Sequence, residues 1–396
     1  MGKLGAVAGF WSLFFAVAVA LVGLGVISPI LPLYMQEFGA SGVELGVVFA
    51  LFSLARFLLS PVFGRISDRM GRKPLILLGL GLYAGVSLAY SMAQALWQVA
   101  IVRLLQGAAS TLVTPLAQAY VADRVQPGRE GRTLNLFYTA QFVGMGIGPI
   151  LGGSLAEHFG LRAPFWAMFF LAVLAGLSVA FLVPKDTRPS RHTKEVRSWR
   201  EILAQPEIWA IAAYMGTRGF WRQAFNAFWP ILAAEKGLGE TLIGTVLTLY
   251  FLGESVFQIT AGYLADRWPA VPQVLWGGVV AVMPLFLIPF VSGVWPAAVL
   301  SVVMGVASAL GRGSLLVLRT RVGRTHGMGA VVGVQTAAFA AGQALGPTLA
   351  GAAQSLAGLT APFFLSGALG LVGALAAAAV LARTGQTRLP ARKRTG

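Results

Sequence analysis

The stretch Gly64-Arg65-Ile66-Ser67-Asp68-Arg69-Met70-Gly71-Arg72-Lys73-Pro74 places four cationic side chains between two long apolar runs. The runs cover residues 43–63 and 75–92, and about 20 apolar residues are enough for a helix to cross a membrane. Short loops that are rich in Lys and Arg stay on the cytoplasmic side. Gly71 tolerates a positive φ, and Pro74 suits the start of a helix. The stretch therefore predicts a cytoplasmic loop of about ten residues between two membrane-spanning helices.

The composition is that of a membrane protein. Of the 396 residues, 57% are hydrophobic and 11% are charged, whereas a soluble domain carries about 25% charged residues. The 49 Gly and 20 Pro residues fit closely packed membrane helices. There is no cysteine, and the three histidines are scattered over predicted loops. Because no phosphate-binding loop, nucleophile–base pair or metal-ligand cluster is visible, the sequence predicts neither an enzyme nor a cofactor or metal site.

Twelve segments are long and apolar enough to span a membrane, so the predicted fold is an all-α membrane protein of twelve transmembrane helices. A polar, basic linker at residues 185–205 separates an N-terminal half, residues 1–184, from a C-terminal half, residues 206–396. The predicted spans are residues 8–35, 43–65, 74–94, 96–122, 133–157, 163–184, 206–234, 240–265, 271–292, 294–318, 328–355 and 360–382.

The distribution of charge predicts the orientation of the chain. With both termini in the cytoplasm, 23 of the 30 Lys and Arg residues fall inside and two, Arg162 and Lys236, fall outside. The other five lie within predicted helices. This asymmetry predicts a multi-pass protein of the plasma or inner membrane. The formal charge of +16 then reflects topology and contact with anionic membrane lipids, and not binding of nucleic acid.

The two halves are related at a constant offset of 198 residues, which indicates a tandem duplication of a six-helix unit. The matching residues are Gly, Pro, Asp, Arg and Trp, types that seldom coincide by chance at one ungapped offset. The pairs include Gly64 and Gly262, Asp68 and Asp266, Arg69 and Arg267, Trp97 and Trp295, Gly107 and Gly305, Gly144 and Gly342, Gly148 and Gly346, and Pro149 and Pro347.

The chain resembles the major facilitator superfamily over essentially its whole length. The loop signature of that family, G-x-x-x-D-R-x-G-R-[RK], is met by Gly64, Asp68, Arg69, Gly71, Arg72 and Lys73. Arg103 begins a sequence similar to the R-x-x-Q-G pattern of proton-coupled members, and Gly144, Gly148, Pro149 and Gly152 resemble the antiporter motif G-x-x-x-G-P-x-x-G-G. The twelve-helix drug:proton antiporters are the most similar subgroup by these motifs. In contrast to many of them, the first helix has no carboxylate before Glu37.

The resemblance implies a monomeric secondary transporter in which two pseudo-symmetric bundles work by alternating access. It implies protons as coupling ion and a small-molecule substrate, with export of drugs or other amphipathic compounds. It also implies a conformational latch, in which Asp68 faces the start of the eleventh helix near Met328, and Arg72 pairs with Asp123. The alternative is a basic loop with no role beyond orientation.

Ionisable residues inside predicted spans are the candidate coupling and cavity residues, because each is costly to insert. Glu254 is the only carboxylate at mid-helix depth, and it is either a proton-binding group or the partner of Arg218, Arg222 or Arg312 in a fixed ion pair. Arg312 is expected near the cytoplasmic end. The five Arg within predicted spans, which include Arg56 and Arg103, outnumber Glu254 and raise a rival hypothesis, an anionic metabolite or lipid head group as substrate.

Polar and aromatic residues within the spans are candidates for the substrate cavity, and lipid-facing or interface positions are the alternative for the aromatic ones. The candidates are Tyr34, Gln118, Gln141, Trp221, Phe225, Asn226, Trp229 and Gln258. Glycines at four-residue spacing in residues 144–152 predict close helix packing, and Pro149 predicts a bend. A lipid-translocating or membrane-sensing protein without solute coupling is a further hypothesis.

Overall fold

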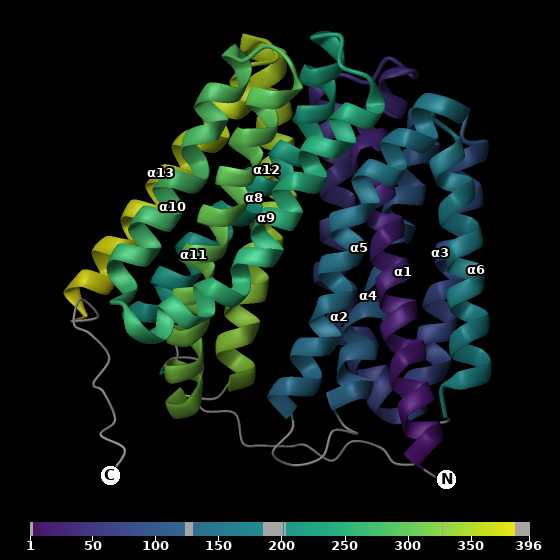
Figure 1. Ribbon diagram of the computed structural model, residues 1–396, viewed down its shortest axis with the longest axis horizontal. Helices are drawn as coiled ribbons and strands as arrows, with labels where there is room; N and C mark the ends of the chain where they lie inside the picture. The colour runs from purple at the N-terminus through teal and green to yellow at the C-terminus, as the bar shows by residue number, and fades with distance from the viewer. Residues whose placement is uncertain (1–2, 123–129, 185–200, 202, 327, 385–396) are drawn as a thin grey trace. The chain divides into compact units, whose positions relative to one another are not determined.

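The computed structural model describes residues 3–122, 130–184, 201, 203–326 and 328–384, and in these residues the regular structure is entirely helical (Figure 1). Twelve long helices confirm the twelve predicted segments. Nine of them are long and apolar enough to cross a membrane, as counted over the described residues. The helices are α1 (Lys3–Gln36), α2 (Gly42–Met70), α3 (Arg72–Met92), α4 (Leu96–Ala122), α5 (Glu130–Phe159), α6 (Ala163–Leu182), α8 (Pro206–Glu235), α9 (Glu240–Arg267), α10 (Ala270–Leu287), α11 (Val294–His326), α12 (Met328–Ala357) and α13 (Ala361–Arg383), with a 3-10 turn η1 at Ile288–Phe290.

The predicted loop at residues 64–73 is wrong in one respect, because it is helical except at Gly71. Helix α2 continues to Met70, α3 begins at Arg72, and Gly71 alone turns the chain, with φ +87°. The Gly71 N–H donates to the Ser67 carbonyl at 3.0 Å. The polar residues thus extend α2 beyond its apolar run, since helical hydrogen bonds satisfy the backbone whether or not the side chains are apolar. Pro74 consequently lies third in α3 and not first, within the turn whose N–H groups have no helical partner.

The chain divides into two compact units. Unit 1 comprises Met1–Thr193 and Trp229–Thr248, and unit 2 comprises Lys194–Phe228 and Leu249–Gly396. The helices α8 and α9 therefore contribute to both units. The halves predicted at residues 1–184 and 206–396 differ from these units by residues 229–248, and they stay a prediction, as does the linker at 185–205.

In unit 1, α1 packs against α5 and α6, while α4 packs against α2 and α3. The contact between α1 and α5 depends on glycines, because a Cβ built on Gly148 would lie 2.6 Å from the Gly25 Cα. A Cβ on Gly152 would likewise overlap the Val26 carbonyl oxygen. The two backbones approach so closely that no larger residue fits without a shift. This observation gives the glycines of the antiporter motif a direct role in helix packing.

The same close contacts recur at the offset of 198. In unit 1, a Cβ on Gly107 would meet Phe52 of α2, and in unit 2 a Cβ on Gly305 would meet Tyr250 of α9. The contacts of Gly144 with Ala18 and of Gly342 with Gly216 repeat in the same way, as do those of Gly148 with Val22 and of Gly346 with Phe220. Helix packing therefore repeats residue for residue, which supports the duplication seen in the sequence.

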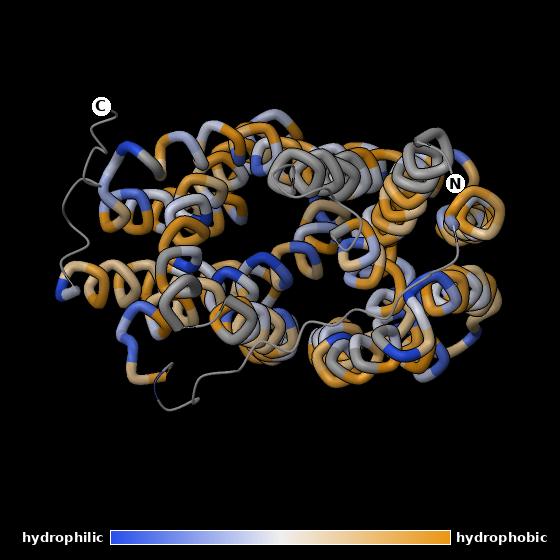
Figure 2. Tube along the Cα trace, turned by 90° about the horizontal axis from the view of Figure 1, so that it is seen from below, coloured by the Kyte–Doolittle hydropathy of each residue, from blue (hydrophilic) through white to orange (hydrophobic). Residues whose placement is uncertain are grey.

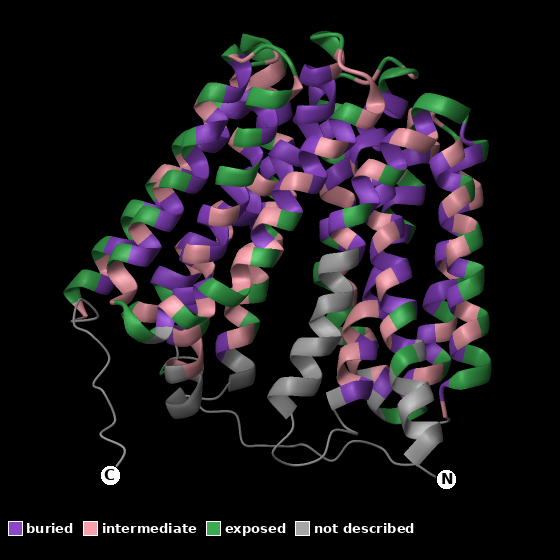
Figure 3. Cartoon of the chain, viewed as in Figure 1, coloured by how far each residue is buried: buried purple, intermediate pink, exposed green. Residues whose placement is uncertain are grey.

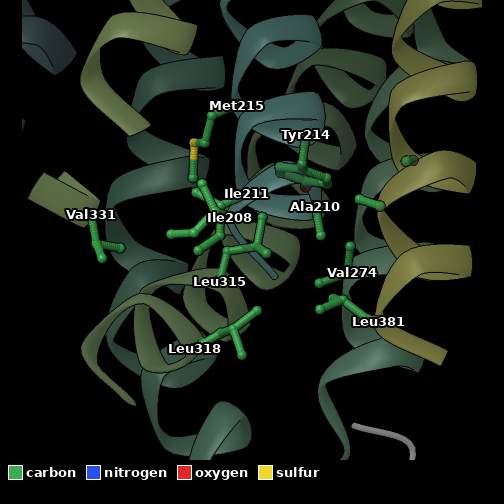
Figure 4. Close-up of a cluster of buried hydrophobic side chains, with 12 residues drawn as sticks. Ile208, Ala210, Ile211, Tyr214, Met215, Val274, Leu315, Leu318, Val331 and Leu381 are labelled. Carbon is green, nitrogen blue, oxygen red and sulfur yellow. The ribbon is translucent and has the colours of Figure 1, made fainter. Parts of the chain in front are cut away.

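The core of unit 2 is a cluster of buried apolar side chains from five helices. Ile208, Ile211 and Tyr214 of α8 meet Val274 of α10 and Leu381 of α13, together with side chains of α11 and α12 (Figure 4).

Buried and exposed positions alternate along the helices (Figure 3), and many of the exposed positions carry large apolar side chains. Phe181 of α6 is 82% exposed and Ile259 of α9 is 83% exposed. Apolar positions recur in the helices, with hydrophilic positions between them (Figure 2). Exposed apolar surface of this extent suits contact with lipid rather than with water.

Candidate functional site

A buried ion group lies in unit 2 and is centred on Glu254, which is 4% exposed in the middle of α9. Arg218 of α8 donates from Nη2 to Glu254 Oε1. Arg312 of α11 donates from Nη1 to the same oxygen at 3.1 Å. The Nε of Arg218 also donates to Ser308 Oγ at 3.0 Å. Glu254 thus contacts two of the three arginines named as its possible partners, and its role in proton coupling stays a prediction.

Helix packing explains why these side chains meet. Gly305 brings α11 against α9 at Glu254, since a Cβ on Gly305 would lie 2.8 Å from the Glu254 backbone nitrogen. Ser308 and Arg312 follow Gly305 by three and seven residues, so all three lie on one face of α11. Arg218 is buried on α8, with 3% of its surface exposed. Three helices therefore converge on one carboxylate inside the apolar part of the protein.

The group has more positive than negative charge. Arg222 lies one turn from Arg218 on α8, and its guanidinium carbon is 5.2 Å from the centroid of the Phe251 ring. Counting Arg312, three cations surround one carboxylate. Within the described part of the chain, no group of three or more His, Cys, Asp or Glu residues could hold a metal ion. The arrangement can bind a proton at the carboxylate or an anion at the arginines.

A second polar cluster lies in unit 1 around Arg103 of α4, which is 6% exposed. Its Nη1 donates to Gln106 Oε1 at 2.7 Å, and the Tyr90 hydroxyl donates to the same oxygen at 3.0 Å. The Arg103 guanidinium carbon lies 4.9 Å from the Phe49 ring centroid and 4.6 Å from that of Phe52. Cation–π contact and one neutral hydrogen bond thus hold this buried cation.

Two predicted cavity residues, Tyr34 and Trp229, are buried and hydrogen-bonded to backbone carbonyls, and their cavity role stays a prediction. The hydroxyl of Tyr34, which is fully buried, donates to the Tyr90 and Ala93 carbonyls at 2.9 and 3.1 Å. The indole Nε1 of Trp229 donates to the Ile243 carbonyl at 3.2 Å. These polar groups therefore satisfy backbone carbonyls within unit 1.

Four other predicted cavity residues lie in unit 2, within one or two helical turns of Arg222 or Glu254 in the sequence. Trp221 and Phe225 of α8 contact the Tyr250 ring edge-on. Asn226 Oδ1 and Gln258 Oε1 are buried and accept no hydrogen bond, so two acceptors are open to a ligand. Gln118 of α4 is half-buried, and the side chain of Gln141 lies outside the described part. The cavity role of these residues stays a prediction.

The end of α2 and the start of α3 form a helical hairpin around Gly71, and the structure describes only some of its side chains. Lys73 Nζ donates to the Ala180 and Val183 carbonyls at 2.8 and 2.5 Å, so it caps the C-terminal end of α6. Arg69 is exposed and Arg72 is buried. The side chain of Asp68, the whole of Asp123 and the side chain of Met328 lie outside the described residues. The proposed latch contacts therefore stay predictions.

Sequence reasoning missed part of the ion group. Ser308 was not predicted to contact it, whereas Arg312 was one of the three arginines named as a possible partner of Glu254. The four-residue spacing of Ser308 and Arg312, which puts both side chains on the face of α11 that follows Gly305, is the signal that points to them.

A contact near the end of α5 was also missed. Glu157 Oε2 accepts from the Thr241 N–H at 2.9 Å, in the first turn of α9 and within unit 1. The Thr241 hydroxyl and N–H hold the pKa of the Glu157 carboxyl below its usual value.

Twelve apolar helices, a duplicated six-helix unit and buried charges in the spans define a polytopic membrane transporter of the secondary type. The family profile of the Major Facilitator Superfamily matches residues 13–221 and 216–396. The chain belongs to the major facilitator superfamily, a family of transporters and not of enzymes.

Relatives and solved structures agree with this assignment. Quinolone resistance protein NorA of Staphylococcus aureus is 24% identical over 378 residues, which cover 91% of this chain and 93% of that protein. An uncharacterized MFS-type transporter of Methanocaldococcus jannaschii is 36% identical over 157 residues, and the match spans only 41% of that relative. The crystal structure of the nucleoside transporter NupG superimposes with a TM-score of 0.78 at 13% identity, covering 94% of this chain and 99% of that one. At that identity the likeness shows the fold alone.

Proposed function

We propose that this transporter exports small amphipathic compounds in exchange for protons, as a monomer in the cell membrane. The observation that carries the proposal is the buried carboxylate of Glu254, which two arginines share inside a membrane-spanning helix. Among the side chains that the structure describes, no other carboxylate lies in the middle of a spanning helix. A buried ionisable group at such a position is costly to maintain and is therefore a functional candidate.

The mechanism follows from the charges around Glu254. When a proton binds to the carboxylate, Arg218 and Arg312 lose the negative charge that they share. The buried arginines then favour a different arrangement of α8, α9 and α11, in which another counter-charge or water reaches them. Alternating access through such rearrangements is the general scheme of transporters built from repeats. NorA is named for resistance to quinolones, and its similarity over nine-tenths of the chain supports a drug-like substrate.

The proposal is tested by proton movement in proteoliposomes that contain the purified protein and an internal pH dye. We expect a fluorescent quinolone or ethidium to drive proton flux with the unaltered protein and with the control Glu201→Gln, which changes an exposed carboxylate. The variant Glu254→Gln should bind substrate but lose substrate-driven proton flux. Proton flux that persists in Glu254→Gln would remove Glu254 as the proton carrier.

A second candidate is transport of an anionic metabolite or an anionic lipid. The observation that favours it is the excess of cations, with Arg218, Arg222 and Arg312 around one carboxylate. In the same proteoliposomes, uptake of an anionic amphipath such as benzoate, lost in Arg218→Ala and accompanied by no response to ethidium, would favour this candidate over the first.

A further inference from the structure

Arg103 in unit 1 and Arg218 in unit 2 differ in whether a carboxylate lies beside the guanidinium. Both side chains are buried, with 6% and 3% of their surface exposed. Arg218 contacts the carboxylate of Glu254. Among the side chains that the structure describes, Arg103 has no carboxylate within ion-pair distance. A guanidinium cannot lose its proton in a protein, so the positive charge of Arg103 stays in the apolar part of α4 without a counter-charge.

Two hydrogen-bond donors at Arg103 also have no acceptor. Arg103 Nε and Gln106 Nε2 are buried and make no hydrogen bond. The orientation of the Gln106 amide is fixed by its neighbours, because Arg103 can only donate and therefore requires the oxygen of the amide. The Tyr90 hydroxyl donates to that same oxygen. One turn of α4 thus presents two unsatisfied donors, and a buried donor without a partner destabilises the protein.

The facing side of α2 adds a second cation. Phe49, Phe52, Ser53 and Arg56 lie at positions i, i+3, i+4 and i+7, and so share one face of α2. The Arg56 guanidinium carbon is 5.6 Å from the Phe52 ring centroid, on the same ring that Arg103 contacts at 4.6 Å. Ser53 Oγ is buried without a hydrogen-bond partner. Two guanidinium groups therefore lie at one aromatic ring, and Arg103 itself contacts no carboxylate among the described side chains.

We propose that unit 1 holds an anion-binding site at Arg103, which takes a small monovalent anion. The guanidinium donors suit a carboxylate or a halide, and Gln106 Nε2 supplies a further N–H. Two sources present this chemistry, a free halide ion and the carboxylate of an amphipathic compound. The inference does not rest on proton coupling at Glu254, because it concerns other residues in the other unit.

The site is tested with purified full-length protein in detergent, by thermal unfolding at constant ionic strength and constant sodium. Sodium gluconate, whose hydrated polyhydroxy chain is ill suited to the aromatic surroundings of Arg103, is replaced stepwise by sodium chloride or sodium benzoate. We expect a saturable rise in the unfolding temperature with at least one of the two anions. A response to chloride alone identifies a free halide ion, and a response to benzoate alone identifies a carboxylate head group.

Variants assign the response to Arg103. Arg103→Gln should abolish it and should be more stable than the unaltered protein in gluconate, because the uncompensated charge is gone. Gln106→Met keeps the volume but removes both the free donor and the oxygen that Arg103 and Tyr90 contact. It should shift the midpoint several-fold, and it covers the case in which Arg103→Gln fails to fold. The control Arg383→Gln changes an exposed cation at the end of α13 and should leave the response unchanged.

Three outcomes would overturn the proposal. The first is an absence of any saturable response to chloride and benzoate. The second is a response that persists unchanged in Arg103→Gln and Gln106→Met. The third is a response that is lost in Arg218→Ala but kept in Arg103→Gln, which would place the anion at the ion group of unit 2.

Discussion

For the buried pair of Glu254 and Arg218, replacing one charge and replacing both should have different effects on stability. Both side chains are almost fully inaccessible, so removing Glu254 leaves Arg218 charged and without a counter-charge, whereas removing Arg218 still leaves Arg312 at the carboxylate. We expect Glu254→Leu to lower the free energy of unfolding by about 3–5 kcal/mol. The double variant Glu254→Leu with Arg218→Met should lose much less, because apolar side chains then replace both charges.

Reversible unfolding in mixed detergent measures these differences, with Glu201→Gln as the exposed control. A single Glu254→Leu variant as stable as the control would mean that water or another anion compensates Arg218. A double variant less stable than either single one would mean that the pair itself contributes net stability.

Glu157 makes a contact that depends on pH. The Thr241 hydroxyl and N–H lower the pKa of the Glu157 carboxyl, so the ionised form is the one that stabilises the folded state. This contribution is present at neutral pH and is lost as the pH falls below the ordinary carboxyl value of 4.5 and through the lowered pKa. Because the carboxylate is exposed, the effect should stay below about 1 kcal/mol.

Thermal unfolding of the unaltered protein and of Glu157→Gln at several pH values checks this. The unaltered protein should be the more stable of the two at pH 7, and the difference should vanish under acidic conditions. A difference that grows as the pH falls has the opposite sign and would exclude the carboxylate as its source.

At the level of the helix, the contact between α1 and α5 depends on the absence of side chains. A Cβ on Gly148 would lie 2.6 Å from the Gly25 Cα, so Gly148→Ala forces the two backbones apart. We expect a loss of about 1–3 kcal/mol, the usual cost of overpacking. The matched control is Gly81→Ala in α3, where a Cβ would meet no atom within 4 Å. That change should be neutral, or stabilise by up to about 1 kcal/mol through helix propensity.

The repeat supplies an internal check on this prediction. Gly346 in α12 occupies the equivalent position, where a Cβ would overlap the Phe220 carbonyl oxygen. Gly346→Ala should therefore destabilise the protein as Gly148→Ala does, when both are measured by unfolding in the same detergent. If Gly148→Ala and Gly81→Ala proved equally stable, close approach of α1 and α5 would not be the reason for the glycines.

The twelve helices could be predicted from the sequence because each apolar run is long enough to span a membrane, and the backbone then has to be helical. Some of the helix ends could not be predicted in this way. Helix α2 continues through its polar residues to Met70, and α11 continues to His326, eight residues beyond the predicted limit. Side-chain partners were harder still. Arg103 and Glu254 stand out as charges in apolar runs, but their contacts with Gln106 and Ser308 depend on how each helix is rotated, which hydropathy alone does not determine.

At the scale of the whole molecule, the charge distribution predicts the topology, and the absence of cysteine makes it directly testable. Glu37 follows α1 in a segment predicted outside, and Glu201 precedes α8 in a segment predicted inside; both are exposed. Either residue can be replaced by cysteine, and the introduced cysteine is then the only one in the chain. Because the basic loops are retained in the cytoplasm, a membrane-impermeant maleimide should label Glu37→Cys in intact cells and label Glu201→Cys only after permeabilisation. The reverse pattern would invert the chain in the membrane and place 23 of its Lys and Arg residues outside, against the charge asymmetry that orients other multi-pass proteins.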